Sequence, residues 1–156
     1  MNGWLLEAWK TTQDEFSDLG DIDHITRVIL RLSLASILGG ILGFEREQKG
    51  KSAGVRTHML VASGAALFIL IPQQAGVSDA ELMRVMQGLV AGIGFLGAGS
   101  IIKVNDRESV TGLTTAAGIW FTAAIGVAAG MGRQSSAVLS TFLALAILSF
   151  SRRFQT

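Results

Sequence analysis

Gly88-Leu-Val-Ala-Gly-Ile-Gly-Phe-Leu-Gly-Ala-Gly99 is a run in which glycine recurs among apolar residues, and the surrounding segment Val85–Ile101 contains no ionisable side chain. In water, each glycine inside a helix costs up to about 1 kcal/mol relative to alanine. In lipid, helices associate by close approach of their backbones, which glycine permits. The run therefore predicts the central transmembrane helix of a small membrane protein.

The composition of the whole chain agrees with a membrane protein. The 156 residues have a mean hydropathy of +0.47 and only 16% charged side chains, which cluster between long apolar stretches. The absence of cysteine excludes disulfides, thiolate metal sites and a cysteine nucleophile. A net charge of +1 argues against a nucleic-acid partner. Motifs of serine hydrolases, zinc proteases and phosphate-binding loops are absent, so we do not expect an enzyme.

Hydropathy and helix signals predict an all-α, polytopic membrane helix bundle within residues 23–151. Asp23 is the expected cap of the first span, Pro72 the expected end of the second, and Ser78 with Glu81 a capping box that opens the third. The last span has only 16 residues, so a bundle of four spans is the alternative. The five expected spans are about 24–44, 55–71, 78–102, 110–129 and 135–150.

Residues 1–22 form a separate N-terminal segment in this interpretation. Trp4 and Trp9 share a face at helical spacing, which is typical of an amphipathic helix lying in the membrane interface. The alternative is a partly ordered tail. At the other end, residues 152–156 are a short cytoplasmic tail. Lysine and arginine gather in the loops after the first and third spans and at the C-terminus, which predicts an external N-terminus and a cytoplasmic C-terminus.

The glycines are expected to be helix-packing positions. Within the third span, the spacing Gly92-x-Gly94-x-x-Gly97 matches a dinucleotide-binding fingerprint, but no soluble strand precedes it and residue 117 is alanine rather than an acid. The alternative to simple packing is a broken helix whose freed backbone groups line a cavity. The expected packing glycines are Gly88, Gly92, Gly94, Gly97 and Gly99 in the third span and Gly118, Gly126 and Gly130 in the fourth.

A polar cluster is expected at the cytoplasmic rim. Glu45-Arg46-Glu47 closes the first span and Arg56-Thr57-His58 opens the second, so antiparallel neighbours bring the two triplets to one depth. Glu45 and Glu47 are candidate ligands for Mg²⁺, which prefers oxygen donors, and His58 is a candidate proton-responsive group. The alternative is an ordinary ion network in which the glutamates pair with Arg46 and Arg56. Further residues expected at this level are Asp106, Glu108, Thr111, Thr114 and Thr115.

Arg84 and Gln87 lie one turn apart near the outer end of the glycine-rich helix. In one interpretation Arg84 pairs with Glu81, three residues earlier. In the other it points inward and marks a polar path or an anion contact.

Four motifs in order resemble those of the MgtC/SapB family of bacterial inner-membrane proteins. They are Gly43-Phe-Glu-Arg-Glu47, Ala53-Gly-Val-Arg-Thr-His58, the run from Gly92 to Gly99, and Gly112-Leu-Thr-Thr-Ala-Ala117 with Trp120. The resemblance covers about residues 27–150. It is to the short, SapB-like kind, without the soluble C-terminal domain of the long members.

The resemblance implies a protein of the inner membrane associated with magnesium limitation. It places the functional positions on Glu45, Arg46, Glu47, Arg56, Thr57, His58, Arg84, Gln87, Thr114 and Thr115. The first functional hypothesis is a regulator of other membrane proteins, the proton-translocating ATP synthase among them. The alternative is a small oligomeric transporter of Mg²⁺ or another ion. The small-residue faces also predict self-association, most simply as a two-fold dimer within the lipid bilayer.

Overall fold

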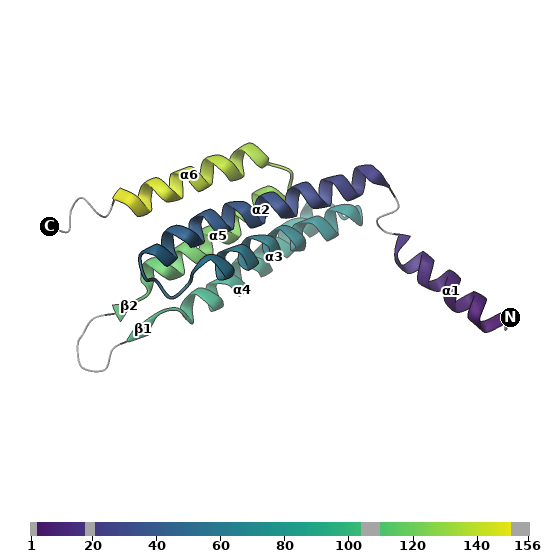
Figure 1. Cartoon of the computed structure of the whole chain (residues 1–156), viewed down its shortest axis with the longest axis horizontal. Helices are drawn as coiled ribbons and strands as arrows, with labels where there is room; N and C mark the ends of the chain where they lie inside the picture. The colour runs from purple at the N-terminus through teal and green to yellow at the C-terminus, as the bar shows by residue number, and fades with distance from the viewer. Residues whose placement is uncertain (1–2, 18–20, 104–109, 151–156) are drawn as a thin grey trace. The chain divides into compact units, whose positions relative to one another are not determined.

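The computed structural model describes residues 3–17, 21–103 and 110–150 and confirms the all-α class (Figure 1). A two-stranded antiparallel pair joins β1 to β2, with Ile102 opposite Thr111. The chain divides into residues 1–30 and residues 31–156, and each unit is considered by itself. The elements are α1 (Gly3–Glu15), α2 (Ile22–Gln48), α3 (Val55–Gln74), α4 (Asp79–Ala98), β1 (Ile102–Lys103), β2 (Val110–Thr111), α5 (Leu113–Gly130) and α6 (Gln134–Phe150).

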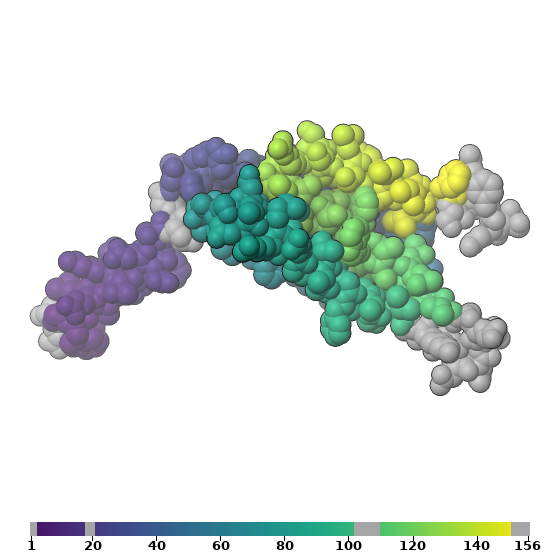
Figure 2. All heavy atoms as spheres, turned by 180° about the vertical axis from the view of Figure 1, so that it is seen from behind, coloured from purple at the N-terminus to yellow at the C-terminus, as the bar shows by residue number. Residues whose placement is uncertain are grey.

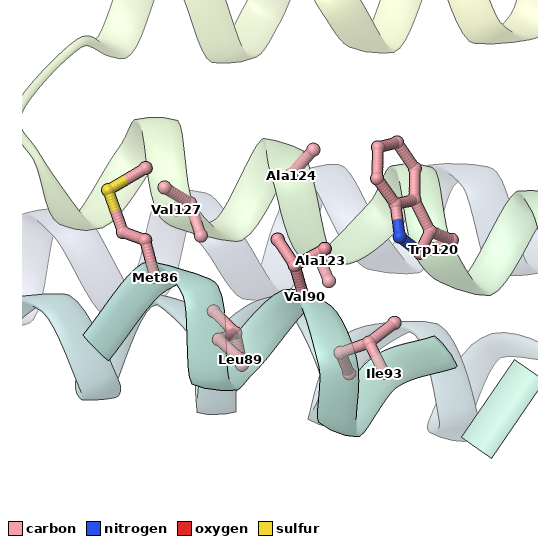
Figure 3. A pocket seen from close by; sticks show the side chains of 8 residues that line it. All are labelled: Met86, Leu89, Val90, Ile93, Trp120, Ala123, Ala124 and Val127. Atoms are coloured by element: carbon pink, nitrogen blue, oxygen red, sulfur yellow. The ribbon is translucent and has the colours of Figure 1, made fainter. Parts of the chain in front are cut away.

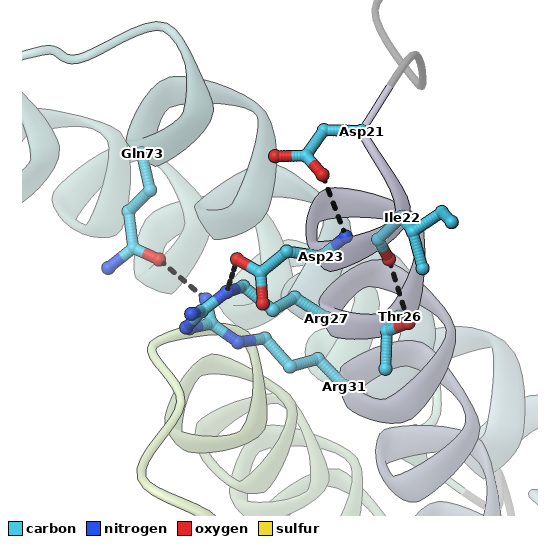
Figure 4. A network of polar contacts seen from close by, with 7 residues as sticks. All are labelled: Asp21, Ile22, Asp23, Thr26, Arg27, Arg31 and Gln73. Carbon is cyan, nitrogen blue, oxygen red and sulfur yellow. Dashed lines mark hydrogen bonds and ion pairs between the residues drawn. The ribbon is translucent and has the colours of Figure 1, made fainter.

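The N-terminal unit contains α1 and the first turns of α2. Helix α1 confirms that residues 3–15 are helical, and its two tryptophans are more than 60% exposed within the unit. At the start of α2, the Asp21 carboxylate accepts the backbone N–H of Asp23 (3.1 Å), so Asp21 rather than Asp23 caps the helix. Asp23 instead forms an ion pair with Arg27 at 2.7 Å, one turn later (Figure 4).

The closest helix packing lies between α3 and α5. A Cβ added at Gly126 would collide with the carbonyl oxygen of Ala62, and one added at Gly130 would lie 2.6 Å from the carbonyl oxygen of Ala66. Both alanines are completely buried. The four-residue spacing of small residues on α5 therefore works as predicted, because two successive turns of α5 sit directly on the backbone of α3.

The prediction that the glycine-rich run forms the central helix is wrong. Helix α4 buries only Leu82 and Gly97, whereas α5 contacts α3, α4 and α6. In the described ranges, nothing lies within 4 Å of a Cβ added at Gly88, Gly92 or Gly94. Figure 2 shows α4, in teal, on the surface of the molecule. Glycine content alone does not reveal whether a neighbouring helix covers the glycines.

Helix α4 packs against α5 through large apolar side chains. Met86, Leu89, Val90 and Ile93 of α4 face α5 across an apolar pocket of about 130 Å³ (Figure 3). Near the end of this seam Gly97 is the α4 glycine that contacts α5, since its Cβ would lie 3.5 Å from the carbonyl oxygen of Ala116. The helix is continuous from Asp79 to Ala98, so the broken-helix alternative is not what the structure shows, and Gly99 caps its end.

Helix boundaries follow the expected signals in part. The capping box of Ser78 and Glu81 is confirmed, with the Glu81 carboxylate 2.9 Å from the Ser78 N–H. Pro72 does not end α3, which continues to Gln74. The fourth predicted span begins too early, because Val110 pairs with Lys103 and the left-handed φ of +94° at Gly112 turns the chain into α5.

Length and composition allow α2, α3 and α5 each to cross a membrane. Helix α6 is apolar but, with 17 residues, shorter. The number of crossings made by the helical segments at the five predicted positions stays a prediction.

Arg31 joins three helices at the end of the bundle where α3 and α5 finish. Its Nη1 donates to the side-chain oxygen of Gln73 at 3.0 Å (Figure 4). The same nitrogen donates to the carbonyl oxygen of Gly130 at 2.7 Å. The second contact satisfies a carbonyl at the C-terminus of α5, where the helix dipole favours a cation.

The α3–α5 contact predicts opposite outcomes for two glycine-to-alanine substitutions. Gly126→Ala is expected to lower the free energy of unfolding by about 1–3 kcal/mol, because the new methyl group meets backbone that cannot move aside. Gly94→Ala is the matched control and is expected to leave stability unchanged or to raise it, because its surroundings are open. Thermal unfolding in detergent measures both, and equal midpoints would contradict the proposed packing.

Candidate functional site

The polar rim forms where α2 ends and α3 and α5 begin. Glycines on α2 bring the two backbones together: a Cβ at Gly43 would lie 2.6 Å from the Cα of Val55, and one at Gly39 would lie 2.5 Å from the carbonyl oxygen of His58. This close approach places the acid–base triplet of α2 beside the first turn of α3, as the sequence predicts.

Glu47 caps α3. Its Oε2 accepts the backbone N–H of Val55 at 2.9 Å, so the carboxylate satisfies a donor that the first turn of a helix leaves unpaired. A negative charge at a helix N-terminus is also favoured by the helix dipole. Thr57 lies within the first turn of α3.

Glu45 lies in an ion network with Arg46 of its own helix and with Lys49, which directly follows that helix. It pairs with Lys49 one turn later, and its Oε2 is 3.9 Å from Nη1 of Arg46. Lys49 also donates to the carbonyl oxygen of Leu148 in α6 at 2.8 Å. This hydrogen bond joins the end of α2 to the last turn of α6.

Arg46 extends the rim to α5. The side chain is only 3% exposed, and its Nη2 donates to the hydroxyl of Thr115 at 3.5 Å. Thr115 is itself buried in the first turn of α5. A buried guanidinium is tolerated only with nearby acceptors, and here these are the Thr115 hydroxyl and the more distant Glu45 carboxylate.

His58 is the most enclosed polar residue of the rim. It is 1% exposed, and its Nδ1 is 2.9 Å from the carbonyl oxygen of Gly54. The other ring nitrogen, Nε2, has no hydrogen-bond partner among the residues that the structure describes. The ring lines a cavity of about 160 Å³ together with residues of α2, α5 and α6.

The structure does not bring every predicted site residue to this rim. Arg56 is exposed at the start of α3, and Thr114 is exposed at the edge of the His58 cavity. Arg84 and Gln87 are exposed on α4, and Arg84 is 13 residues, or about 20 Å of helix, from the glycine that meets α5 near the rim. Glu81 closes the capping box of α4. Asp106 and Glu108 lie outside the described residues.

The partners of the two candidate metal ligands are cations and backbone N–H groups. Glu45 faces Lys49 and Arg46, and Glu47 binds the N–H of Val55. Within residues 3–17, 21–103 and 110–150, no three histidine, aspartate or glutamate side chains gather where they could hold a metal ion. The described carboxylates are thus engaged by cations and by a backbone N–H, and the use of Glu45 and Glu47 as Mg²⁺ ligands stays a prediction.

Sequence reasoning missed two parts of this site. Lys49 enters the sequence analysis only as one of the loop cations that indicate topology. Its position four residues after Glu45 is nevertheless a recognisable signal for the ion pair that the two residues form. The α6 residues that meet the rim, Leu148 and its neighbours in the His58 cavity, carry no local signal because they are apolar and nearly a hundred residues away along the chain.

Arg46 is predicted to be a structural requirement of the rim, unlike the neighbouring Arg56. Arg46→Met and Arg46→Lys are both expected to lower the free energy of unfolding by about 1–3 kcal/mol, because the contact with Thr115 is lost and an ammonium does not reproduce the guanidinium fork. Arg56→Met, at an exposed position, is the control and should change little. Thermal unfolding in detergent provides the measurement, and three equally stable variants would contradict this role.

Comparison with known proteins agrees with the helical architecture and the motifs. Residues 32–156 match the model of the MgtC family. The chain is 43% identical to Protein SrpB of Synechococcus elongatus, over 80% of this chain and 75% of SrpB. It is 40% identical to the putative magnesium transporter YhiD of Escherichia coli K12, over 77% of this chain and 58% of YhiD. It is also 43% identical to Protein MgtC of Brucella abortus, over 78% of this chain and 50% of that protein.

The chain thus spans little more than half the length of YhiD and half that of the Brucella protein. No solved structure matches it. Its own helices, three of them long and apolar enough to span a bilayer, and the family match over four fifths of its length make it a membrane protein. The chain belongs to the MgtC family.

Proposed function

We propose that this protein acts in the bacterial inner membrane in magnesium homeostasis or the response to low magnesium, by binding and regulating other membrane proteins. The link to magnesium is supported by the name of the relative YhiD, a putative magnesium transporter. Regulation through binding is supported by the surface of α4. The proposal includes no catalysed reaction.

The observation that carries the proposal is the uncovered glycine surface of α4. Gly88 and Gly92 line a hollow of about 420 Å³ beside α3, with Phe68 on the α3 side. Within the described chain, nothing lies within 4 Å of a Cβ added at either glycine. In a bilayer, such a surface allows another helix to approach closely enough for backbone contact. The occupant in this proposal is a transmembrane helix of a partner protein.

The polar rim also favours regulation over ion transport. Its described acids already have partners, Lys49 and Arg46 for Glu45 and the α3 N-terminus for Glu47. In the sequence, no acid occurs between Glu47 and Asp79, between Glu81 and Asp106, or after Glu108. A divalent cation crossing the bilayer would need carboxylate or carbonyl oxygens at mid-depth, and α4 is a continuous helix that offers no freed carbonyls there.

Transport is the second candidate function, because the name of YhiD points to it. In that case the protein would work as an oligomer with Glu45 at the mouth of the path. In both cases we infer an external N-terminus and a cytoplasmic C-terminus from the placement of lysine and arginine. Self-association as a dimer through α4 is the partner proposal that the small-residue surface supports. Binding of the ATP synthase is a second proposal, which rests on the resemblance to the MgtC/SapB family.

Partner binding through α4 is tested by two leucine substitutions on the same helix. Gly92→Leu fills the hollow beside Phe68, whereas Gly94→Leu projects from a different side of α4, about 200° around the helix. We expect Gly92→Leu to lower recovery of a stoichiometric membrane partner from mild detergent at least tenfold, and Gly94→Leu to leave recovery unchanged. Quantitative mass spectrometry of the co-purified proteins makes the measurement.

Recovery of only a second copy of this chain would support the dimer and contradict regulation of a different protein through this surface. Equal recovery with both leucine variants would remove α4 as the binding surface.

Mg²⁺ flux distinguishes the two functions. Liposomes that contain only this protein are expected to take up Mg²⁺ no faster than protein-free liposomes, as followed with an encapsulated magnesium dye. Fast uptake that Glu45→Ala abolishes would establish transport and overturn the regulatory proposal. Glu7→Ala, on an exposed face of α1, is the control for a change of charge away from the rim.

A further inference from the structure

The cavity beside His58 is lined mostly by apolar residues, with Thr114 at its exposed edge and the His58 ring as its buried polar side chain. Helices α2, α5 and α6 supply Leu42, Gly118, Phe121, Ala144 and Ile147 among its walls. The His58 ring, on α3, forms another wall of the cavity. It is 1% exposed, and its Nε2 has no hydrogen-bond partner in the described part of the chain. Gly118 stands directly opposite, since a Cβ added there would lie 3.7 Å from Nε2. A buried polar atom without a hydrogen-bond partner costs free energy, so a ligand that forms a hydrogen bond with this nitrogen would bind favourably.

The hydrogen bond on the other side of the ring determines what that ligand must offer. The Gly54 carbonyl can only accept, so His58 Nδ1 at 2.9 Å carries the hydrogen and donates it. In the neutral ring the second nitrogen then has a free lone pair and accepts. An imidazolium in a pocket lined by leucine, alanine and phenylalanine would be costly to desolvate. The group that fits Nε2 is therefore a neutral hydrogen-bond donor such as a hydroxyl.

The size and the opening of the cavity narrow the ligand further. Its volume of 160 Å³ is several times that of one water molecule and close to the cavity of about 150 Å³ that holds benzene in an engineered protein core. Thr114, Ala117 and Ile147 line it and are exposed, so the cavity opens on the outer surface between α5 and α6. In a membrane this surface faces lipid, and a molecule dissolved in the bilayer can enter there.

We propose that the cavity between α2, α5 and α6 binds a lipid-soluble alcohol or phenol, whose apolar body fills the cavity and whose hydroxyl donates to Nε2 of His58. This site is independent of the glycine surface of α4 and of any Mg²⁺ flux. Ala144, Ile147 and Leu148 of α6 form part of the wall, so a bound molecule also contacts α6. Lys49 joins this helix to the end of α2 through its hydrogen bond to Leu148.

Phenol and toluene are the matched probes, because they have nearly the same size and differ in the donor. The chain has two histidines, so ¹⁵N-histidine labelling in nanodiscs gives signals for His58 and for the exposed His24 as an internal control. At equal concentrations in the lipid phase, we expect phenol to shift the His58 Nε2 resonance saturably and to bind roughly three- to tenfold more tightly than toluene, the value of one hydrogen bond. His24 should show no saturable shift.

A substitution at Gly118 separates the cavity from unspecific effects of phenol. Gly118→Ala places a methyl group at ordinary contact distance from Nε2, so the backbone has no need to move while the nitrogen is screened from the cavity. We expect the saturable shift to be lost in Gly118→Ala and kept in Gly92→Ala, the matched control on α4, where a new Cβ meets open space.

Three results would overturn the proposal. They are equal affinity for toluene and phenol, a saturable shift that persists in Gly118→Ala, and an Nε2 resonance that responds to neither probe, as expected if water alone occupies the cavity. The comparison of phenol with toluene in the unsubstituted protein decides the question even if Gly118→Ala fails to fold.

Discussion

The contact between the backbones of α3 and α5 is the constraint on which the rest of the bundle depends. Two glycines of α5 lie on two consecutive turns of α3, at Ala62 and Ala66, with no room for a methyl group between them. In a bilayer, dispersion contacts at this distance replace the hydrophobic effect as the force between helices. With α3 held on one side, α5 has its other sides free for α4 and α6, which explains why it occupies the middle.

How much the sequence reveals depends on whether a signal is local. The capping box at Ser78 and the spacing of Gly126 and Gly130 were predicted correctly, because each needs only a few residues and a general rule. The central position of the run Gly88–Gly99 was predicted wrongly, because the same composition occurs in a covered and in an uncovered helix, although Gly97 does pack on α5. Pro72 also misled: it removes one backbone hydrogen bond, yet α3 continues for two residues beyond it.

The candidate site likewise combines features that a local signal predicts with features that depend on the folded structure. Adjacency of the triplets around Arg46 and His58 follows from two antiparallel helices joined by a short connection, and the sequence is enough to predict it. Two features depend on side-chain orientation, which residue spacing does not predict. They are the capping of α3 by Glu47 and the unpaired acceptor nitrogen, Nε2, of His58 among the described residues. The contribution of α6 depends on contacts across nearly a hundred residues and could be seen only in the folded chain.

The bond from Lys49 to the carbonyl of Leu148 has a consequence for the order of assembly. A ribosome delivers the chain from its N-terminus, so the lysine emerges long before its acceptor has been made. During synthesis the end of α2 therefore lacks this contact until α6 has been made and has docked. Until residue 148 has been made, the ammonium group at this end of α2 can pair with Glu45 but not with α6.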